Sequence, residues 1–174
     1  MPLAGGFPAM PDARREARPV VSLLASIALT VTVGAIGGLA TAHSVDTWYP
    51  GLNKPSFNPP NRVFAPVWTA LYVLMAIAAW RVFLAVQSRS RTLALALFGL
   101  QLALNLAWSL IFFGLRAPLP ALVELALLLL AIAATVAMFW RLDRLAGVLL
   151  VPYAAWCCFA FLLNAEIWLL NRLR

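Results

Sequence analysis

Residues 118–140 read PLPALVELALLLLAIAATVAMFW, and the only charged side chain in this stretch is that of Glu124. An α-helix rises about 1.5 Å per residue, so a run of this length reaches across the roughly 30 Å hydrocarbon core of a bilayer. A small domain in water could not cover so much apolar surface. The stretch therefore predicts a transmembrane helix.

Four further runs have the same character, and together they predict an all-α integral membrane protein built as a five-transmembrane-helix bundle. The chain of 174 residues is 64% hydrophobic and only 11% charged, which leaves no room for a separate soluble domain. Residues 20–174 are expected to form one transmembrane domain, and residues 1–19, rich in Pro, Gly and charge, a mobile N-terminal tail. The expected spans are about 20–42, 59–86, 91–115, 118–140 and 145–170.

The net charge of +7 comes from basic residues at the ends of the apolar runs. This placement is typical of interfacial arginines that set topology and meet the lipid membrane, and it gives no reason to expect nucleic acid as a partner. Eight lie on the side that we expect to be cytoplasmic, together with the N-terminus: Arg14, Arg15, Arg18, Arg81, Arg89, Arg91, Arg141 and Arg144. The long loop 43–60 then faces outward.

Several local features predict where helices begin and bend. Asn58 followed by Pro59 suggests an N-cap with proline at the first helical position. Pro152 is expected to kink the fifth helix. Asp143 is expected to pair with an arginine of its own turn, and Glu124 to lie in the first turn of its helix, where the helix dipole favours an anion.

Polar and aromatic residues share faces of three of the predicted helices. Amides in the middle of a span are costly against lipid and should face the bundle interior; here they are Gln101, Asn105 and Asn164. Each lies on a helix stripe with a deep tryptophan, Trp108 or Trp156, and Trp68 lies on a similar stripe of the second helix. Two interpretations stay open: interhelical packing with hydrogen bonds, or a flat aromatic cavity for a planar apolar ligand.

Small residues recur every fourth position on the third helix, at Gly99, Ala103 and Ala107. Such a ridge lets two backbones approach closely, either inside the bundle or between two copies of the chain. We take it as the hypothetical interface of a homodimer.

The sequence lacks the residues of several common chemistries. His43 is the only histidine and lies at the membrane edge, so we expect no histidine-based metal or haem site within the spans, and we name no metal ligands and no obligatory cofactor. No nucleophile elbow, phosphate-binding loop or pair of carboxylates at catalytic spacing occurs, which argues against a conventional hydrolase or an ATP-driven pump. Cys157 and Cys158 are neighbours on one helix, about 100° apart, and are expected to stay unpaired.

A longer pattern covers about residues 20–172. It runs Trp48-Tyr49, Leu52-Asn53-Lys54-Pro55, Asn58-Pro59-Pro60, Val63-Phe64, Trp68-Thr69, Leu71-Tyr72, Met75, then Gln101, Asn105, Trp108, Phe112-Phe113-Gly114, and ends with Trp140, Asp143, Ala146-Gly147, Pro152-Tyr153, Trp156 and Leu163-Asn164. This order and spacing resembles the translocator protein family, also called the TspO/MBR proteins, tryptophan-rich sensory proteins or peripheral-type benzodiazepine receptors.

The resemblance implies a five-helix bundle, usually dimeric, that binds porphyrins and other planar aromatic ligands in a pocket capped by the loop between helices one and two. It implies a set of ligand-binding residues: Phe64, Trp68, Tyr72, Asn105, Trp108, Tyr153 and Trp156. Eukaryotic members are tied to cholesterol handling, and bacterial members to tetrapyrrole efflux, stress regulation and light-dependent breakdown of protoporphyrin IX.

Two departures favour the bacterial type. Ser56-Phe57 replaces a pair that often holds tryptophan. The cholesterol motif requires a basic residue soon after Tyr153, and none occurs before Arg172. The first hypothesis is therefore a tetrapyrrole-binding protein of a bacterial cell membrane, with porphyrin as ligand or as substrate of a light-dependent reaction. In it, Trp156 and Trp68 are the candidate catalytic residues, and Lys54 and Arg62 the candidate cations for the propionates. The alternative is a transporter or stress sensor that binds porphyrin or sterol-like ligands without chemistry.

Overall fold

The computed structural model describes residues 13–173, with side chains from Pro19 onward. The described residues form five long α-helices and contain no strand: α1 (Ala13–Thr47), α2 (Asn61–Leu84), α3 (Arg89–Ser109), α4 (Pro118–Leu142) and α5 (Arg144–Asn171). A short 3-10 turn, η1 (Tyr49–Gly51), follows α1, and a π-helical turn, η2 (Leu110–Gly114), extends α3.

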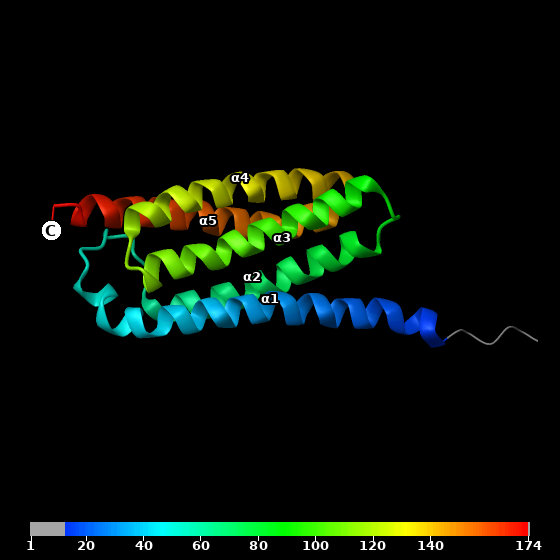
Figure 1. Cartoon of the computed structure of the whole chain (residues 1–174), viewed down its shortest axis with the longest axis horizontal. Coiled ribbons are helices and arrows are strands. Elements are labelled where there is room, and N and C mark those ends of the chain that lie inside the picture. Colours follow the sequence, from blue (N-terminus) through cyan, green and yellow to red (C-terminus); the bar gives the residue numbers. More distant parts are fainter. Residues whose placement is uncertain (1–12, 174) are drawn as a thin grey trace, which may run out of the picture.

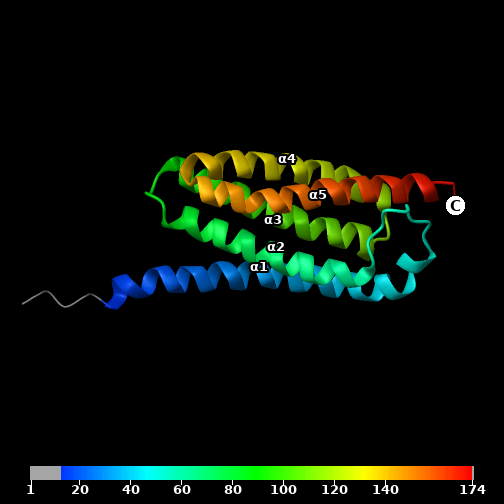
Figure 2. The ribbon, with the colours of Figure 1, turned by 180° about the vertical axis from the view of Figure 1, so that it is seen from behind.

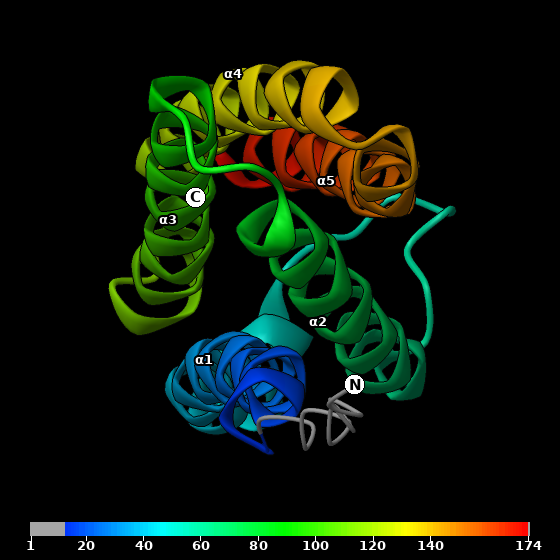
Figure 3. The ribbon, with the colours of Figure 1, turned by 90° about the vertical axis from the view of Figure 1, so that its right-hand side faces the viewer.

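All five helices are long and apolar enough to cross a membrane. Seen along the bundle, they lie in the ring order α1, α2, α5, α4, α3, and α3 returns to α1 (Figure 3). The start of α1 and the end of α5 lie at opposite ends of the bundle (Figure 1). Large apolar side chains such as Leu39 and Leu130 are exposed on the outside, where they meet lipid. The protein is therefore a multi-pass integral membrane protein, as predicted.

A buried core joins α2, α4 and α5. Met75 and Val82 of α2 are fully buried in the same cluster as Leu128 of α4 and Leu150 of α5. At the α4–α5 turn, a Cβ atom at Gly147 would lie only 2.9 Å from the Cα atom of Trp140. The close approach of these two helices therefore depends on glycine at this position.

Helix α1 is attached differently, by a narrow stripe of small residues seven positions apart. Thr30, Gly37 and Ser44 are its buried residues among those whose side chains are described. The Thr30 hydroxyl donates to the carbonyl of Tyr72 (3.1 Å), and the Ser44 hydroxyl donates to the carbonyl of Phe113 (2.7 Å). Hydrogen bonds and close backbone approach thus hold α1 to the other helices, because lipid removes most of the gain from apolar burial.

The predicted spans are confirmed in number, and their ends shift by a few residues. Helix α1 already begins at Ala13, because the Arg- and Ala-rich residues 13–18 are good helix formers; its membrane-crossing part is 19–47. Most of the predicted mobile tail, residues 1–12, lies outside the described part of the chain, so the tail stays a prediction. Helix α5 continues in helical conformation through Pro152.

Three local predictions are wrong, two of them because another residue takes the side chain as its partner and one because of where the helix begins. Helix α2 begins at Asn61 after Pro60, since the Asn58 side chain accepts a hydrogen bond from the Tyr49 hydroxyl (2.8 Å) instead of capping the helix. Glu124 lies beyond the first turn of α4, which begins at Pro118, and is buried. Asp143 pairs with Arg81 of α2 (2.8 Å) rather than with an arginine of its own turn.

Asp143 also caps α5, since its Oδ1 atom accepts a hydrogen bond from the backbone N–H of Ala146 (3.1 Å). Burial acts to raise the pKa of Asp143, but the hydrogen bonds from Arg81 and Ala146 and the charge of Arg81 outweigh it. The pKa of Asp143 is therefore lowered, and the charged form stabilises the fold.

We predict that Asp143→Ala lowers the free energy of unfolding by about 1–2 kcal/mol, and Asp143→Asn by less than about 1 kcal/mol. Asparagine keeps the cap and loses only a partly exposed ion pair. Thermal unfolding in detergent measures both. Because the folded pKa is lowered, the advantage of the wild type over Asp143→Asn should persist above pH ~4, the usual range of Asp, and disappear at lower pH. Equal losses in the two variants would contradict the capping role.

The small-residue ridge of α3 is available for assembly. Gly99 and Ala103 are exposed on the single chain, and a Cβ atom at Gly99 would meet nothing within 4 Å. We therefore predict that Gly99→Leu or Ala103→Leu yields monomers in size-exclusion chromatography with light scattering, without loss of folding. Ala134→Leu, on the exposed face of α4, is the matched control and should leave assembly unchanged. If both ridge variants stay dimeric, the ridge is not the dimer interface.

Candidate functional site

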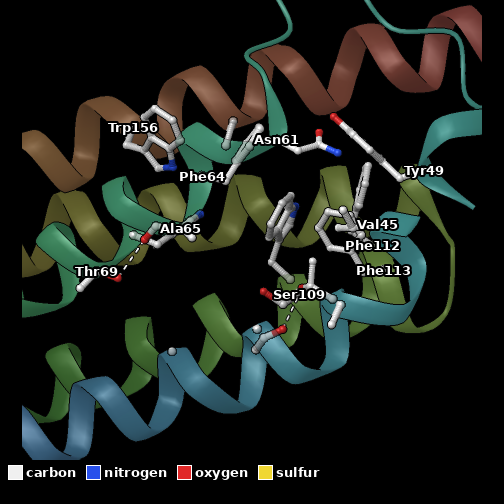
Figure 4. A pocket seen from close by; sticks show the side chains of 18 of the residues that line it. Val45, Tyr49, Asn61, Phe64, Ala65, Thr69, Ser109, Phe112, Phe113 and Trp156 are labelled. Atoms are coloured by element: carbon white, nitrogen blue, oxygen red, sulfur yellow. Dashed lines mark hydrogen bonds between the residues drawn. The ribbon is translucent and has the colours of Figure 1, made fainter. Parts of the chain in front are cut away.

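A cavity of about 600 Å³ lies between α1 on one side and α2, α3, η2 and α5 on the other. Figure 4 shows Phe64 from α2 and Trp156 from α5 on one side of it, with Tyr49, Phe112 and Phe113 towards one end. The α1 side consists mostly of small residues, among them Gly34, Gly38 and Ala42. The opposite side, here called the aromatic wall, consists of Phe64, Trp68, Tyr72, Trp108, Phe112, Phe113, Trp156 and Phe159.

The three deep tryptophans belong to this one wall. Trp68 stacks on Tyr72 with ring centroids 5.6 Å apart, and Trp108 stacks on Phe112 at 5.4 Å. Trp156 meets the edge of Phe64 at 5.9 Å. Aromatic pairs at these separations stabilise each other by roughly 0.5–1.5 kcal/mol beyond their buried area, so the wall is a preformed surface.

Two of the mid-span amides hold the wall in place: Asn164, which itself lines the cavity, and Asn105, which lies outside it. The Trp108 indole N–H donates to Asn164 Oδ1 (3.1 Å), and Asn164 Nδ2 donates to the carbonyl of Pro118 (2.8 Å). The Tyr72 hydroxyl donates to Asn105 Oδ1 (2.6 Å). The two interpretations of the sequence pattern, interhelical hydrogen bonds and an aromatic cavity, are therefore compatible, because the hydrogen bonds orient the rings that line the cavity.

The structure brings together five of the seven residues that the resemblance implies as ligand-binding: Phe64, Trp68, Tyr72, Trp108 and Trp156 line the cavity. Asn105 and Tyr153 do not. Tyr153 is only 1% exposed, and its ring packs against the edge of Trp68 at 6.3 Å. These two residues support the wall rather than face the cavity.

The loop after α1 lies at the end of the bundle where α5 ends (Figure 2). Tyr49 at the start of this loop and Asn61 just after it line the cavity. Two hydrogen bonds join Asn53 of the loop to Asn171 at the end of α5. The backbone N–H of Asn53 donates to Asn171 Oδ1 (3.0 Å), and Asn171 Nδ2 donates to the carbonyl of Asn53 (2.9 Å). The Tyr49 hydroxyl donates to Asn58, and burial raises the pKa of Tyr49 despite this hydrogen bond. Tyr49 therefore stays a neutral hydrogen-bond donor at the cavity end.

Neither of the two candidate propionate contacts lines the cavity. The Lys54 ammonium lies 4.8 Å from the centre of the Tyr49 ring and donates to the carbonyls of Pro50 and Leu52. Arg62 is exposed near the start of α2. The charged residue that does line the cavity is Asp46, at the end of α1. Sequence reasoning missed it.

Sequence reasoning also missed the α1 side and Phe113. Small residues at Gly34 and Gly38 indicate a close approach of helices, and nothing in their spacing distinguishes a contact from a cavity. Phe112 and Phe113 both line the cavity although they are neighbours. The π-helical turn η2 adds a residue to the helix here and changes the direction of the side chains, a device common at functional sites.

The contact of α1 with the aromatic wall can be tested with two matched variants, Gly34→Ala and Gly38→Ala. A Cβ atom at Gly34 would lie 2.5 Å from the Tyr72 ring, whereas one at Gly38 would meet nothing within 4 Å. Alanine improves helix propensity equally at both sites. We predict that Gly34→Ala is less stable than Gly38→Ala by about 1–3 kcal/mol, because Tyr72 must move and strain its bond to Asn105. Thermal unfolding of the two variants measures the difference. Equal stability would mean that α1 shifts away from Tyr72 without any loss of free energy of unfolding.

Comparison with known proteins agrees with this architecture. The family model of the TspO/MBR family matches residues 26–169. The chain is 42% identical over 155 residues to the tryptophan-rich protein TspO of Archaeoglobus fulgidus, covering 87% of this chain and 98% of that protein. It is 40% identical to the protein CrtK of Rhodobacter capsulatus (81% and 89% covered) and 43% identical to the human translocator protein (80% and 85% covered). The chain belongs to the TspO/MBR family.

Proposed function

We propose that the cavity binds a planar free-base tetrapyrrole of the protoporphyrin IX type, with the macrocycle against Trp68 and Trp156. The observation that carries this proposal is the aromatic wall, which lines a cavity of about 600 Å³. Small-molecule sites measure roughly 300–1,000 Å³ and combine apolar walls with a few polar groups. A flat macrocycle gains most from such a wall, since it stacks on several rings at once.

The polar groups around the cavity support a free base rather than haem. No histidine, cysteine or methionine is among the described residues that line the cavity, so haem iron would find none of these three ligands there, and the hydroxyls of Tyr49 and Tyr72 are already bonded to Asn58 and Asn105. A tetrapyrrole with two propionates would place them towards the loop end. There Lys54 can turn from the carbonyls of its own loop to a carboxylate.

The test of binding is a titration in the dark. Purified protein is titrated with protoporphyrin IX while tryptophan fluorescence is recorded. The proposal requires saturable quenching with one porphyrin per chain, and the affinity should fall about tenfold or more in Trp68→Ala, because a stacking surface is lost. Trp80→Ala, at the opposite end of α2, is the matched control. Quenching that never saturates, or that is the same in both variants, would contradict a binding site in the cavity.

Asp46 provides an electrostatic test of where the propionates lie. Its carboxylate lines the cavity near the loop, so it should repel an anionic porphyrin. We predict that Asp46→Asn binds protoporphyrin IX a few-fold more tightly at low salt and less so at high salt, as expected for exposed charges. Octaethylporphyrin, which has no carboxyl groups, should bind both proteins equally. An equal gain for both porphyrins would place the propionates elsewhere.

The proposal extends to light-dependent degradation of the bound porphyrin. Trp156 lines the cavity beside Phe64 and Phe159, where its indole can pass an electron to the photoexcited ring or to an oxygen species formed beside it. We predict that Trp156→Phe keeps the dissociation constant within about tenfold, which is ~1.4 kcal/mol, because most of the aromatic area remains. The rate of porphyrin bleaching in light should fall much further. Equal losses would reduce Trp156 to a stacking surface.

A second candidate function is carriage or sensing of the ligand without chemistry. The attachment of α1 by the narrow Thr30–Gly37–Ser44 stripe favours it, because a helix held in this way can move and open the cavity towards lipid. Illumination of the complex separates the two candidates. A protein-dependent absorbance change with a distinct open-chain product supports the enzyme, and unchanged porphyrin supports carriage or sensing.

A further inference from the structure

A second group of polar residues lies behind the aromatic wall, outside the cavity. Glu124 of α4 is 8% exposed, and neither of its carboxyl oxygens has a hydrogen-bond partner in the described part of the chain. Gln101 of α3, at 1% exposed, likewise has both amide atoms unpaired there. Buried polar groups are normally paired, so carboxyl and amide groups in this state, in the middle of a membrane, indicate a functional role.

These residues belong to a cluster to which four helices contribute. Gln101 and Asn105 are one turn apart on α3, and Tyr153 and Cys157 are one turn apart on α5. The Tyr153 hydroxyl has no hydrogen-bond partner among the described residues, and Cys157 is buried in the same core cluster as Leu125, the neighbour of Glu124 on α4. Tyr72 of α2 joins the cluster through its 2.6 Å hydrogen bond to Asn105.

The cluster reaches from a buried carboxyl group to the cavity. Tyr72 has its ring in the aromatic wall and its hydroxyl group in the cluster, so it belongs to both. Tyr72 is bonded to Asn105, and the Tyr153 ring packs against Trp68 of the wall. Of the six residues of the cluster, Tyr72 is the one that lines the cavity. A change at the wall can therefore reach the cluster through Tyr72 and Tyr153.

No cation among the described side chains pairs with Glu124. The titratable groups of the cluster besides Glu124 are Tyr72 from α2 and Tyr153 and Cys157 from α5, and α3 contributes the amides of Gln101 and Asn105. Among the described side chains the one ion pair is Arg81–Asp143, which lies at the far end of α4. An unpaired carboxylate inside an apolar bundle is strongly disfavoured, whereas a carboxylic acid is neutral and gains an O–H donor.

We propose that Glu124 is an internal proton site of the bundle, held as a carboxylic acid and linked through Tyr153, Asn105 and Tyr72 to the occupancy of the cavity. In this link, a ligand on the aromatic wall displaces Tyr72 and alters its bond to Asn105, and the rearranged cluster changes the surroundings of the Glu124 carboxyl group. The link to occupancy rests on the proposed porphyrin binding, and the proton site itself does not.

Infrared difference spectroscopy tests the proton site directly. A protonated carboxyl group has a C=O band that is separate from those of carboxylates and amides. At neutral pH we expect this band in the wild type, its loss in Glu124→Gln, and its retention in Glu166→Gln, a half-buried glutamate of α5. Glutamine has nearly the same size as glutamate, so the variant should fold, which circular dichroism checks. The absence of an acid band, or its survival in Glu124→Gln, would overturn the proposal.

Octaethylporphyrin tests the link, because it carries the macrocycle without carboxyl groups of its own. At saturation it should shift the Glu124 band in the wild type, and the shift should be lost in Tyr72→Phe, which keeps the ring and removes the hydroxyl that binds Asn105. A porphyrin that quenches tryptophan saturably but leaves the band unshifted would refute the link and leave the proposed function intact. If no saturable quenching occurs, porphyrin binding fails, while the acid band still decides the proton site.

Discussion

The attachment of α1 is the interaction on which the rest of the structure depends. In lipid, apolar side chains gain little by moving from the bilayer into the protein, so helices associate through small residues and hydrogen bonds. Thr30, Gly37 and Ser44 meet this requirement along one stripe, through the carbonyls of Tyr72 and Phe113 and close contact with α3. The remaining inward face of α1 is too small to fill the space before the aromatic wall, and a cavity is the result.

The same constraint explains why amides and aromatic rings occur together. An amide inside a bilayer needs a partner on another helix, and Asn105 and Asn164 find theirs in the polar ends of Tyr72 and Trp108. These bonds fix the rings as a side effect of satisfying the amides. The rings of the cavity wall are therefore held in place by the same hydrogen bonds that join the helices.

The architecture was predictable because it depends on properties that the sequence states locally. The length and composition of the apolar runs predict five spans, and the stripes on three helices predict that Trp68, Trp108 and Trp156 meet. What could not be predicted depends on partners elsewhere in the chain. Asn58 accepts a hydrogen bond from Tyr49, and Asp143 forms an ion pair with Arg81. The π-helical turn, which brings Phe113 into the wall, and the unpaired state of Glu124 likewise follow only from the assembled bundle.

The central claim is that a planar tetrapyrrole lies between α1 and the aromatic wall, and an experimental structure of the complex tests it most directly. The protein would be saturated with protoporphyrin IX in the dark and its structure determined. The account predicts macrocycle density inside the cavity, in contact with Trp68 and Trp156 and with its propionates towards the loop that carries Lys54. Density on an outer, lipid-facing surface with the cavity empty, for example along the Gly99–Ala103 ridge, would contradict it.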